Sequence, residues 1–244
     1  MHLTRASLKS RYRKTLAGLV WVVLNPLIMF GVQSLVFRKF LRMEIPNFYL
    51  FLVSGLLPWI FLTQTIQMGT PVLVSQGSLL KSFRFHPLVL VASTVLDNLL
   101  NFLLAVLLIG VPVMLKSEQP LSHLLFLPLC LIPFVMGGFS LTILTSVLHV
   151  FFRDTAFVLN FCFGILFFVT PIFYPVDFMP LEYRWLVDVN PLFQLLAPFR
   201  LLMYSAAPFD WVGPWFISMA WALGLTFVSQ AYWRRKRNAL YSHV

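Results

Sequence analysis

The sequence predicts an all-α membrane protein with six transmembrane helices. Of its 244 residues, 59% are hydrophobic and only 11% are charged, and its mean hydropathy is +0.86. Soluble domains carry about 25% charged residues, so this chain has too few charges to cover a water-facing surface. Several uncharged stretches also exceed the ~20 residues that a bilayer-crossing helix needs. These observations exclude a soluble enzyme, a disordered tail and a disulfide-stapled secreted module.

Six segments are long enough and apolar enough to cross about 30 Å of hydrocarbon as helices. The predicted spans are residues 16–37, 47–68, 88–115, 124–151, 155–176 and 211–233. The third span contains a single charge, Asp97, with Asn101 one helical turn further on. Burying a carboxylate in a membrane is costly, so Asp97 is a functional candidate. We expect Asp97 and Asn101 to pair with a neighbouring helix or subunit, and a proton-coupled transporter is the alternative.

A seventh apolar stretch, residues 189–209, is ambiguous because it contains Arg200 and three prolines. Five Lys/Arg residues precede the first span and four follow the last one, in the basic tail 234–244. The positive-inside rule therefore places both termini in the cytoplasm, which requires an even number of crossings. We therefore expect re-entrant half-helices between the fifth and sixth spans, where protein or a water-filled cavity can satisfy the backbone.

Residues 1–15 are expected to form an amphipathic interfacial helix. Arg5, Lys9 and Arg13 recur every four residues and share one face, while Leu8 and Tyr12 begin an adjoining apolar stripe. Such a helix lies in the membrane plane with its cations among the lipid head groups. It either anchors the protein or receives a phosphate-bearing lipid, because arginine can donate two hydrogen bonds to a phosphate at once.

The chain lacks the residue patterns of several catalytic sites. It has no Gly-Lys pair and so no phosphate-binding loop of its own. Its five histidines are scattered, and its two cysteines lie in separate apolar runs, so neither indicates a metal site or a disulfide. His149 and Asp154 match the His-x4-Asp pattern of membrane acyltransferases, in which the histidine is a general base, and this reading is kept as an alternative.

A series of short motifs resembles one transporter family. In order, they are RYRKTLAGLVW from Arg11, LNPL from Leu24, LLKSFRFHP from Leu79, FFRDT from Phe151, TPIFYP from Thr170, and NPL from Asn190 followed by Phe199-Arg200. Their order and spacing are similar to those of type-2 ATP-binding-cassette exporter permeases, in particular the branch that exports O-antigen, capsule and teichoic-acid polymers.

The resemblance implies a non-enzymatic half-permease of the bacterial inner membrane. It would form a homodimer with a channel at the dimer axis and would move a lipid-linked polysaccharide. Two copies of a separate nucleotide-binding subunit would bind ATP and Mg²⁺, while this chain holds no cofactor and binds no nucleic acid. A drug or small-lipid exporter of the same superfamily is the second reading.

In such a permease we expect three sets of site residues. Segment 75–87 would contact the ATPase, and the region 177–208 would form an outer gate. The candidate coupling residues are Lys81, Ser82, Phe83, Arg84, Phe85 and His86. The candidate lipid head-group residues are Arg11, Tyr12, Arg13, Lys14, Gly18 and Trp21. The candidate channel or gate aromatics are Phe168, Phe173, Tyr174 and Phe178, although membrane interfaces are rich in aromatic residues in any case.

Overall fold

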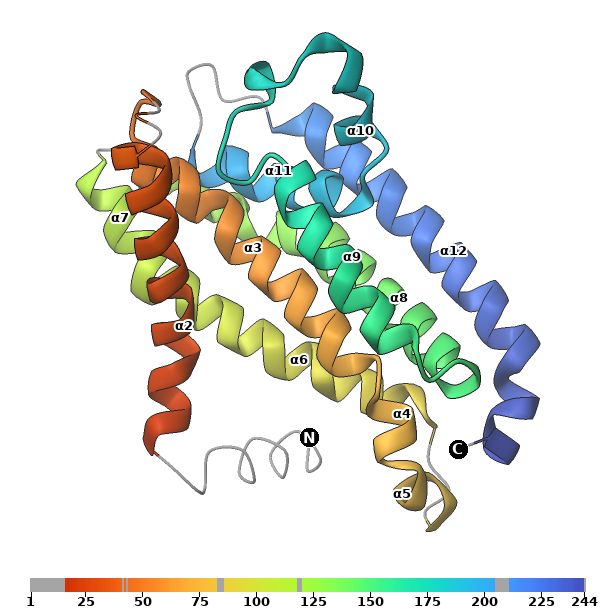
Figure 1. The fold of residues 1–244 in the computed structure, drawn as a ribbon. Helices are drawn as coiled ribbons and strands as arrows, with labels where there is room; N and C mark the ends of the chain where they lie inside the picture. The colour runs from red at the N-terminus through yellow and green to blue at the C-terminus, as the bar shows by residue number, and fades with distance from the viewer. Residues whose placement is uncertain are drawn as a thin grey trace.

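A computed structural model describes residues 16–40, 42, 44–82, 86–117, 120–204 and 211–243. All regular structure within these residues is helical, as the sequence predicts. The predicted interfacial helix over residues 1–15 lies outside this part of the chain. In Figure 1 the long helices run alongside one another, and α10 and α11 lie at one end of the bundle.

Each of the six predicted spans contains a helix. The helices are α2 (Leu16–Ser34), which continues as the π-helical turn η1 (Leu35–Phe40); α3 (Phe48–Gly69); α6 (Leu88–Ala105), which continues through η2 (Val106–Gly110) and α7 (Val111–Lys116); η3 (Leu121–Phe126) with α8 (Leu127–Phe151); α9 (Thr155–Val169); and α12 (Val212–His243). Among the described residues, four helices are long and apolar enough to cross a membrane, and a bent pair raises this number to five. The six-span topology therefore stays a prediction.

Helix α9 ends at Val169, short of the predicted limit at Val176. The residue before a proline disfavours the helical conformation, and Thr170 before Pro171 is extended, with φ −78° and ψ 125°. Fifteen residues of helix span about 22 Å, less than the hydrocarbon thickness. The segment that follows α9, which contains Pro171 and Pro175, is not helical.

A bent helix pair occupies the place where the sequence predicts half-helices. After α9 come η4 (Val176–Phe178), η5 (Leu181–Tyr183), α10 (Trp185–Asp188) and α11 (Pro191–Met203). The helical stretches Leu181–Asp188 and Pro191–Met203 meet at 90°. Helix α11 packs against α3, α8 and α12, so it forms part of the core of the bundle.

Four phenylalanine rings form the centre of that core. Phe61 of α3, Phe102 of α6, Phe134 of α8 and Phe199 of α11 lie with neighbouring ring centroids 4.6–5.5 Å apart. All four side chains are buried. Each such aromatic pair contributes about 0.5–1.5 kcal/mol beyond the burial of its area. The rings therefore fix α11 against three long helices.

A second apolar cluster lies at the end of the bundle away from α10 and α11. Here α4 (Val72–Ser75) and α5 (Gly77–Ser82) pack against α6, α8 and α12 through buried residues that include Leu73, Leu80 and Leu240. Figure 1 shows α4 and α5 at the same end as the α8–α9 turn and the last turns of α12. Helix α12 runs through the predicted basic tail, and Lys236 Nζ lies 5.0 Å from the centroid of the Phe151 ring.

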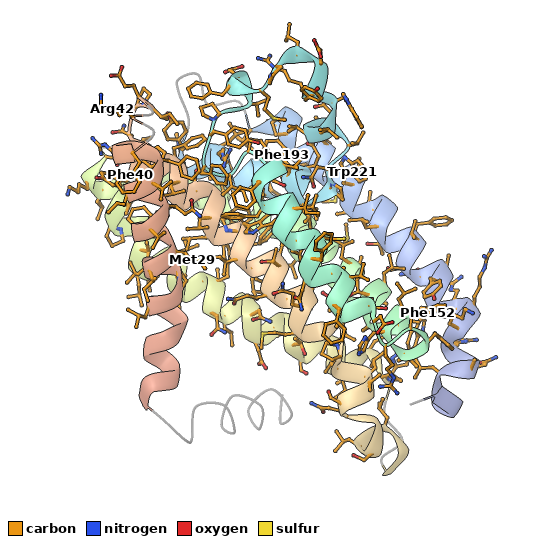
Figure 2. The ribbon with its side chains drawn as sticks, in the orientation of Figure 1. Met29, Phe40, Arg42, Phe152, Phe193 and Trp221 are labelled. Atoms are coloured by element: carbon orange, nitrogen blue, oxygen red, sulfur yellow. The ribbon has the colours of Figure 1, made fainter. Side chains whose placement is uncertain are left out.

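Large apolar side chains project from the outer sides of the helices, as Figure 2 shows. Helix α9, for example, exposes Phe157, Phe161 and Phe168, whose spacings of four and seven residues place them on one face. Phe152 is likewise exposed at the α8–α9 turn. Exposed apolar surface of this extent indicates contact with lipid or with another protein chain rather than with water.

Candidate functional site

A groove of about 400 Å³ lies between α2, α3 and α9 and is open on one side. Helix α3 contributes Leu56, Trp59, Ile60, Thr63, Gln64 and Gln67 to its lining, α9 contributes Asn160, Phe163, Gly164, Phe167 and Phe168, and α2 contributes Met29. On both α3 and α9 the lining residues recur at alternating steps of three and one, which places them on one helical face. The groove is therefore formed by the facing sides of two helices.

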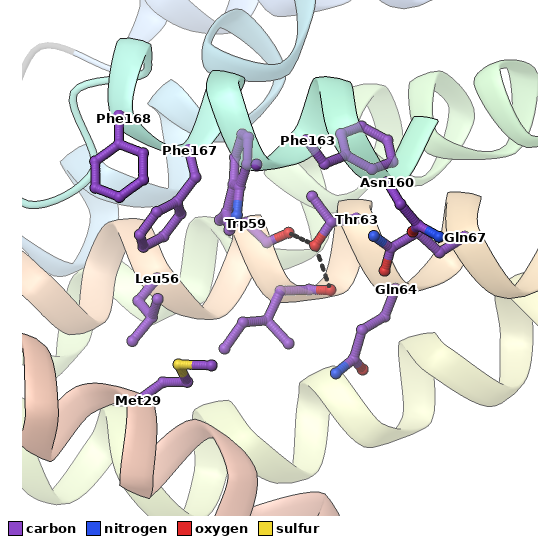
Figure 3. A pocket seen from close by; sticks show the side chains of 12 residues that line it. Met29, Leu56, Trp59, Thr63, Gln64, Gln67, Asn160, Phe163, Phe167 and Phe168 are labelled. Carbon is purple, nitrogen blue, oxygen red and sulfur yellow. Dashed lines mark hydrogen bonds between the residues drawn. The ribbon is translucent and has the colours of Figure 1, made fainter. Parts of the chain in front are cut away.

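One end of the groove is aromatic. The rings of Trp59 and Phe167 have centroids 6.0 Å apart, and those of Phe167 and Phe168 are 5.5 Å apart. Figure 3 shows Phe167 and Phe168 on the α9 side of this end, with Trp59 facing them from α3. Gly164 adds no side chain, and a Cβ placed there would meet nothing within 4 Å. The absence of a side chain at Gly164 therefore leaves open space next to the aromatic rings.

The other end of the groove carries amides. Gln64 and Gln67 lie one turn apart on α3, and Asn160 faces them from α9 (Figure 3). Thr63 turns its hydroxyl back to its own helix and donates to the carbonyl oxygens of Trp59 and Ile60, at 2.9 and 3.4 Å. Within the described part of the chain the three amides make no hydrogen bond, so their donors and acceptors remain available to a bound molecule.

The four predicted channel aromatics occupy different environments. Phe168 lines the groove and is 66% exposed. Phe173 is buried and stacks on Phe37 of η1, with ring centroids 4.1 Å apart. The Tyr174 hydroxyl donates to the carbonyl oxygens of Phe168 and Val169. Phe178 is exposed in η4, away from the groove lining. Of the four, Phe168 alone lines the groove within one copy of the chain.

The start of α11 is fixed by hydrogen bonds from two amides. Asn190 caps the helix: its Oδ1 accepts from the Leu192 and Phe193 backbone N–H groups at 3.0 and 3.4 Å. Its Nδ2 donates to Thr170 Oγ1 at 2.8 Å. Gln194 donates to the Val187 carbonyl at 3.1 Å and so holds α10 at the bend. The predicted outer gate is therefore tied to the end of α9.

Arg200 links α11 to both α9 and α3. Its guanidinium is buried and donates to the carbonyl oxygens of Pro171 and, at 2.7 Å, Ile172. Its Cζ lies 4.5 Å from the centroid of the Phe51 ring. Gly55 makes this approach possible, because a Cβ there would lie 2.2 Å from Arg200 Nη2. The prolines of the α9–α10 segment break the helical hydrogen bonding, and the arginine satisfies the carbonyls that are left.

The predicted coupling residues lie at the α4–α5 end. Lys81 and Ser82 are the last residues of α5, and Phe83, Arg84 and Phe85 lie outside the described residues. The exposed ring of His86 has its centroid 5.5 Å from that of Trp233 in α12. Within the predicted coupling segment 75–87 the structure describes the helix α5 (Gly77–Ser82), and α4 ends at Ser75, where the segment begins.

The other predicted residues add no second cluster. Asp97 is buried and Asn101 is half-buried on α6. His149 is buried in the last turn of α8, whereas Asp154 is exposed in the following turn. The side chains of the predicted head-group residues Arg11 to Trp21 lie outside the described part of the chain. Among the described residues, no group of three or more His, Cys, Asp or Glu side chains could hold a metal ion.

Most of the groove lining was not predicted from the sequence, including Trp59, Gln64, Gln67 and Asn160. Their signal is the shared spacing of three or four residues on two apolar segments. That spacing becomes informative only once α3 and α9 are known to face each other.

Comparison with known proteins assigns the family. The profile of the ABC-2 type transporter family matches residues 1–204. An O-antigen export system permease protein RfbA from Myxococcus xanthus is 29% identical over 235 residues, which cover 93% of this chain and 90% of the relative. Two proteins of the same name from Klebsiella pneumoniae are 29% identical over 86% of this chain and 28% identical over 88%, and the matches cover 82% and 84% of those relatives. This chain belongs to the ABC-2 type transporter family.

Proposed function

We propose that this chain is the membrane-spanning permease subunit of an ATP-binding-cassette exporter that moves a lipid-linked polysaccharide out of the cytoplasm. The family match and the three near-full-length relatives named as O-antigen export permeases support this proposal. Two copies of the chain would enclose the path at their shared axis. A drug exporter and an acyltransferase are not favoured by these relatives.

The observation that carries the proposal is the chemistry of the groove. Sugars are amphiphilic: the C–H faces of their rings pack against aromatic rings, and their hydroxyls exchange hydrogen bonds with amides. The groove offers both: the rings of Trp59, Phe167 and Phe168 lie at one end, and the three amides lie at the other. A path for lipid tails alone would have no use for the amides, because an unpaired amide in an apolar medium is costly.

The basic end of α12 supports a cytoplasmic location for the α4–α5 end of the bundle. The basic run Arg234–Arg237 lies near the end of α12, and Trp233 and Leu240 of this helix belong to the same apolar cluster as residues of α4 and α5. Positive charge concentrates on the cytoplasmic side of membrane proteins. With six spans both termini would be cytoplasmic, the interfacial helix 1–15 would lie on the inner leaflet of the bacterial plasma membrane, and α10 and α11 would lie on the outer side.

Energy would come from a separate ATPase subunit that binds ATP and Mg²⁺, two copies per permease dimer. The α4–α5 segment would seat in that subunit, since it is the part of the bundle that projects beyond the long helices at the proposed cytoplasmic end (Figure 1). Closure of the ATPase pair would then displace α3 and α6, the helices on either side of this segment. The groove face of α3 would move with it.

The test is reconstitution of the chain with its partner ATPase subunit. The purified complex is placed in liposomes, and ATP hydrolysis and the movement of a lipid-linked glycan are measured together. We expect the glycan to stimulate hydrolysis and to cross the bilayer only when ATP is present. Stimulation by hydrophobic drugs but by no lipid-linked glycan would refute the proposal in favour of a drug exporter.

A further inference from the structure

We infer that Gln64, Gln67 and Asn160 form a binding subsite for uncharged sugar units of the transported chain. This inference rests on the proposed function and deepens it, because it names the substrate class that the groove accepts. The three amides stand on the two facing helices α3 and α9, close enough to line one groove (Figure 3). They lie toward the α4–α5 end, so a glycan that came from the proposed cytoplasmic side would meet them before the aromatic rings.

The amides match the hydroxyl groups of a sugar. Each amide carries two N–H donors and a carbonyl acceptor, and each hydroxyl is one donor and an acceptor. Amides on both sides of the groove can therefore bond to different hydroxyls of one sugar ring. A repeating chain that slides through the groove can exchange these bonds as successive sugars pass. Phe163 lies beside Asn160 and offers an apolar ring at the same level.

The absence of charge in the lining sets the selectivity. None of the twelve lining side chains is charged. An anion that leaves water for an apolar protein interior needs a cation or several strong donors to offset its lost hydration. Among its lining residues this groove offers neutral amide donors but neither cation nor metal site, so these donors would offset only part of the hydration that a carboxylate loses, whereas an uncharged sugar exchanges water for amides.

A lipid tail or the apolar face of a second copy of this chain would leave the amides unsatisfied. Gln64 and Gln67 are half-buried and Asn160 is exposed within one copy of the chain, so a cover of lipid or apolar protein would remove them from water without pairing them. Three such amides at one end of the groove therefore favour an occupant with hydroxyl groups. Water fills the site between sugars, and each arriving hydroxyl replaces a water hydrogen bond.

The experiment uses the complete complex of permease and ATPase in liposomes. Two lipid-linked glycans of equal length and equal lipid are compared, one of uncharged hexoses and one that contains hexuronic acids. The variants are Gln67→Leu and Asn160→Leu, which keep roughly the side-chain volume, and the control is Gln33→Leu, which removes an amide of α2 outside the groove lining. ATPase activity without glycan measures assembly.

We expect the wild-type complex to move the uncharged glycan at least about tenfold faster than the anionic one. Each leucine variant in the groove should slow the uncharged glycan about three- to tenfold, as expected for the loss of one or two net hydrogen bonds. Gln33→Leu should leave the rate unchanged. Equal rates for the two glycans, or groove variants that transport like the wild type, would overturn the subsite and leave the proposed function intact. A wild-type complex that moves neither glycan would overturn the proposed function itself.

A labelling measurement covers the case in which the leucine variants do not assemble. Asn160→Cys is made in a chain whose Cys130 and Cys162 are replaced by alanine. A glycan stalled by removal of ATP should protect the new thiol from a water-soluble maleimide, and a cysteine at Gln33 should stay equally reactive with and without glycan. Undiminished labelling of the cysteine at position 160 in the stalled complex would exclude sugar from the site.

Discussion

Replacing Gly55 by alanine should weaken the attachment of α11 to α3. The new Cβ would lie 2.2 Å from Arg200 Nη2, 3.2 Å from its Cζ and 3.1 Å from the Ile172 carbonyl oxygen. The guanidinium cannot turn aside at no cost, because two carbonyls and the Phe51 ring hold it. Either the arginine leaves this site or the backbones of α3 and α11 move apart.

Both routes cost several kilocalories per mole. Withdrawal of Arg200 gives up two hydrogen bonds from a charged group, worth about 1.5–3 kcal/mol each, and a desolvated cation–π contact worth about 2 kcal/mol. Part of this loss is recovered when the freed groups reach water. Separation of the helices would instead loosen the four-ring cluster around Phe199. We therefore expect Gly55→Ala to lower the free energy of unfolding by about 3–5 kcal/mol.

The assay is unfolding of the full chain by sodium dodecyl sulfate in mixed micelles, followed by tryptophan fluorescence. Gly224→Ala in α12 is the matched control, because a Cβ there meets nothing within 4 Å and should cost nothing. Repeating Gly55→Ala in an Arg200→Met background measures the coupling between the two residues. The cost should fall to about 1–2 kcal/mol there, since a flexible thioether can move aside. An equal cost in both backgrounds would show that the guanidinium is not the obstacle.

Three further changes test other parts of the bundle. Asn190→Ala removes the α11 cap and should cost about 1 kcal/mol in the same unfolding assay, whereas Asn190→Ser, which keeps an acceptor, should restore most of it. Gly137→Ala places a Cβ 2.6 Å from the flexible Leu195 side chain, so a rotamer change should limit its cost to about 1–3 kcal/mol. Lys81→Glu combined with Arg84→Glu should abolish export while membrane insertion, measured by fractionation, stays intact; normal export would remove both residues from coupling to the ATPase.

The helices were predictable because the membrane leaves the backbone few choices. Every backbone N–H and C=O group of a helix in hydrocarbon must be hydrogen-bonded within its own segment. A long uncharged stretch therefore predicts a helix with little help from local propensity. Helix α3 shows this well: predicted over residues 47–68, it runs from Phe48 to Gly69. Helix α12 overran its predicted limit because its basic turns can continue as helix beyond the bilayer, where hydropathy gives no signal.

The groove was not predictable in the same way. Hydropathy treats Gln64, Gln67 and Asn160 simply as tolerated polar residues within apolar segments. Their meaning depends on the fact that α3 and α9 turn these faces toward each other, and no single-helix pattern contains that information. Phe173 shows a second kind of information that the sequence does not contain: its position groups it with Phe168, but the fold buries it against Phe37. Phe168 and Phe173 are five residues apart, but α9 ends between them, and one ring is exposed while the other is buried.

The charge of Arg200 argues against a membrane crossing by residues 189–209. In the structure its guanidinium is buried and hydrogen-bonded to backbone carbonyls. Because the chain beyond α9 is not helical, the carbonyls of Pro171 and Ile172 in the protein interior have no helical donor, and Arg200 from α11 donates to both. The broken α9 and the half-helix α11 therefore require each other. Any motion of α11 that preserved these bonds would carry Pro171 and Ile172 with it, and through them the end of α9 that bears Phe168. A shift of α11 and reshaping of the aromatic end of the groove would then be one movement.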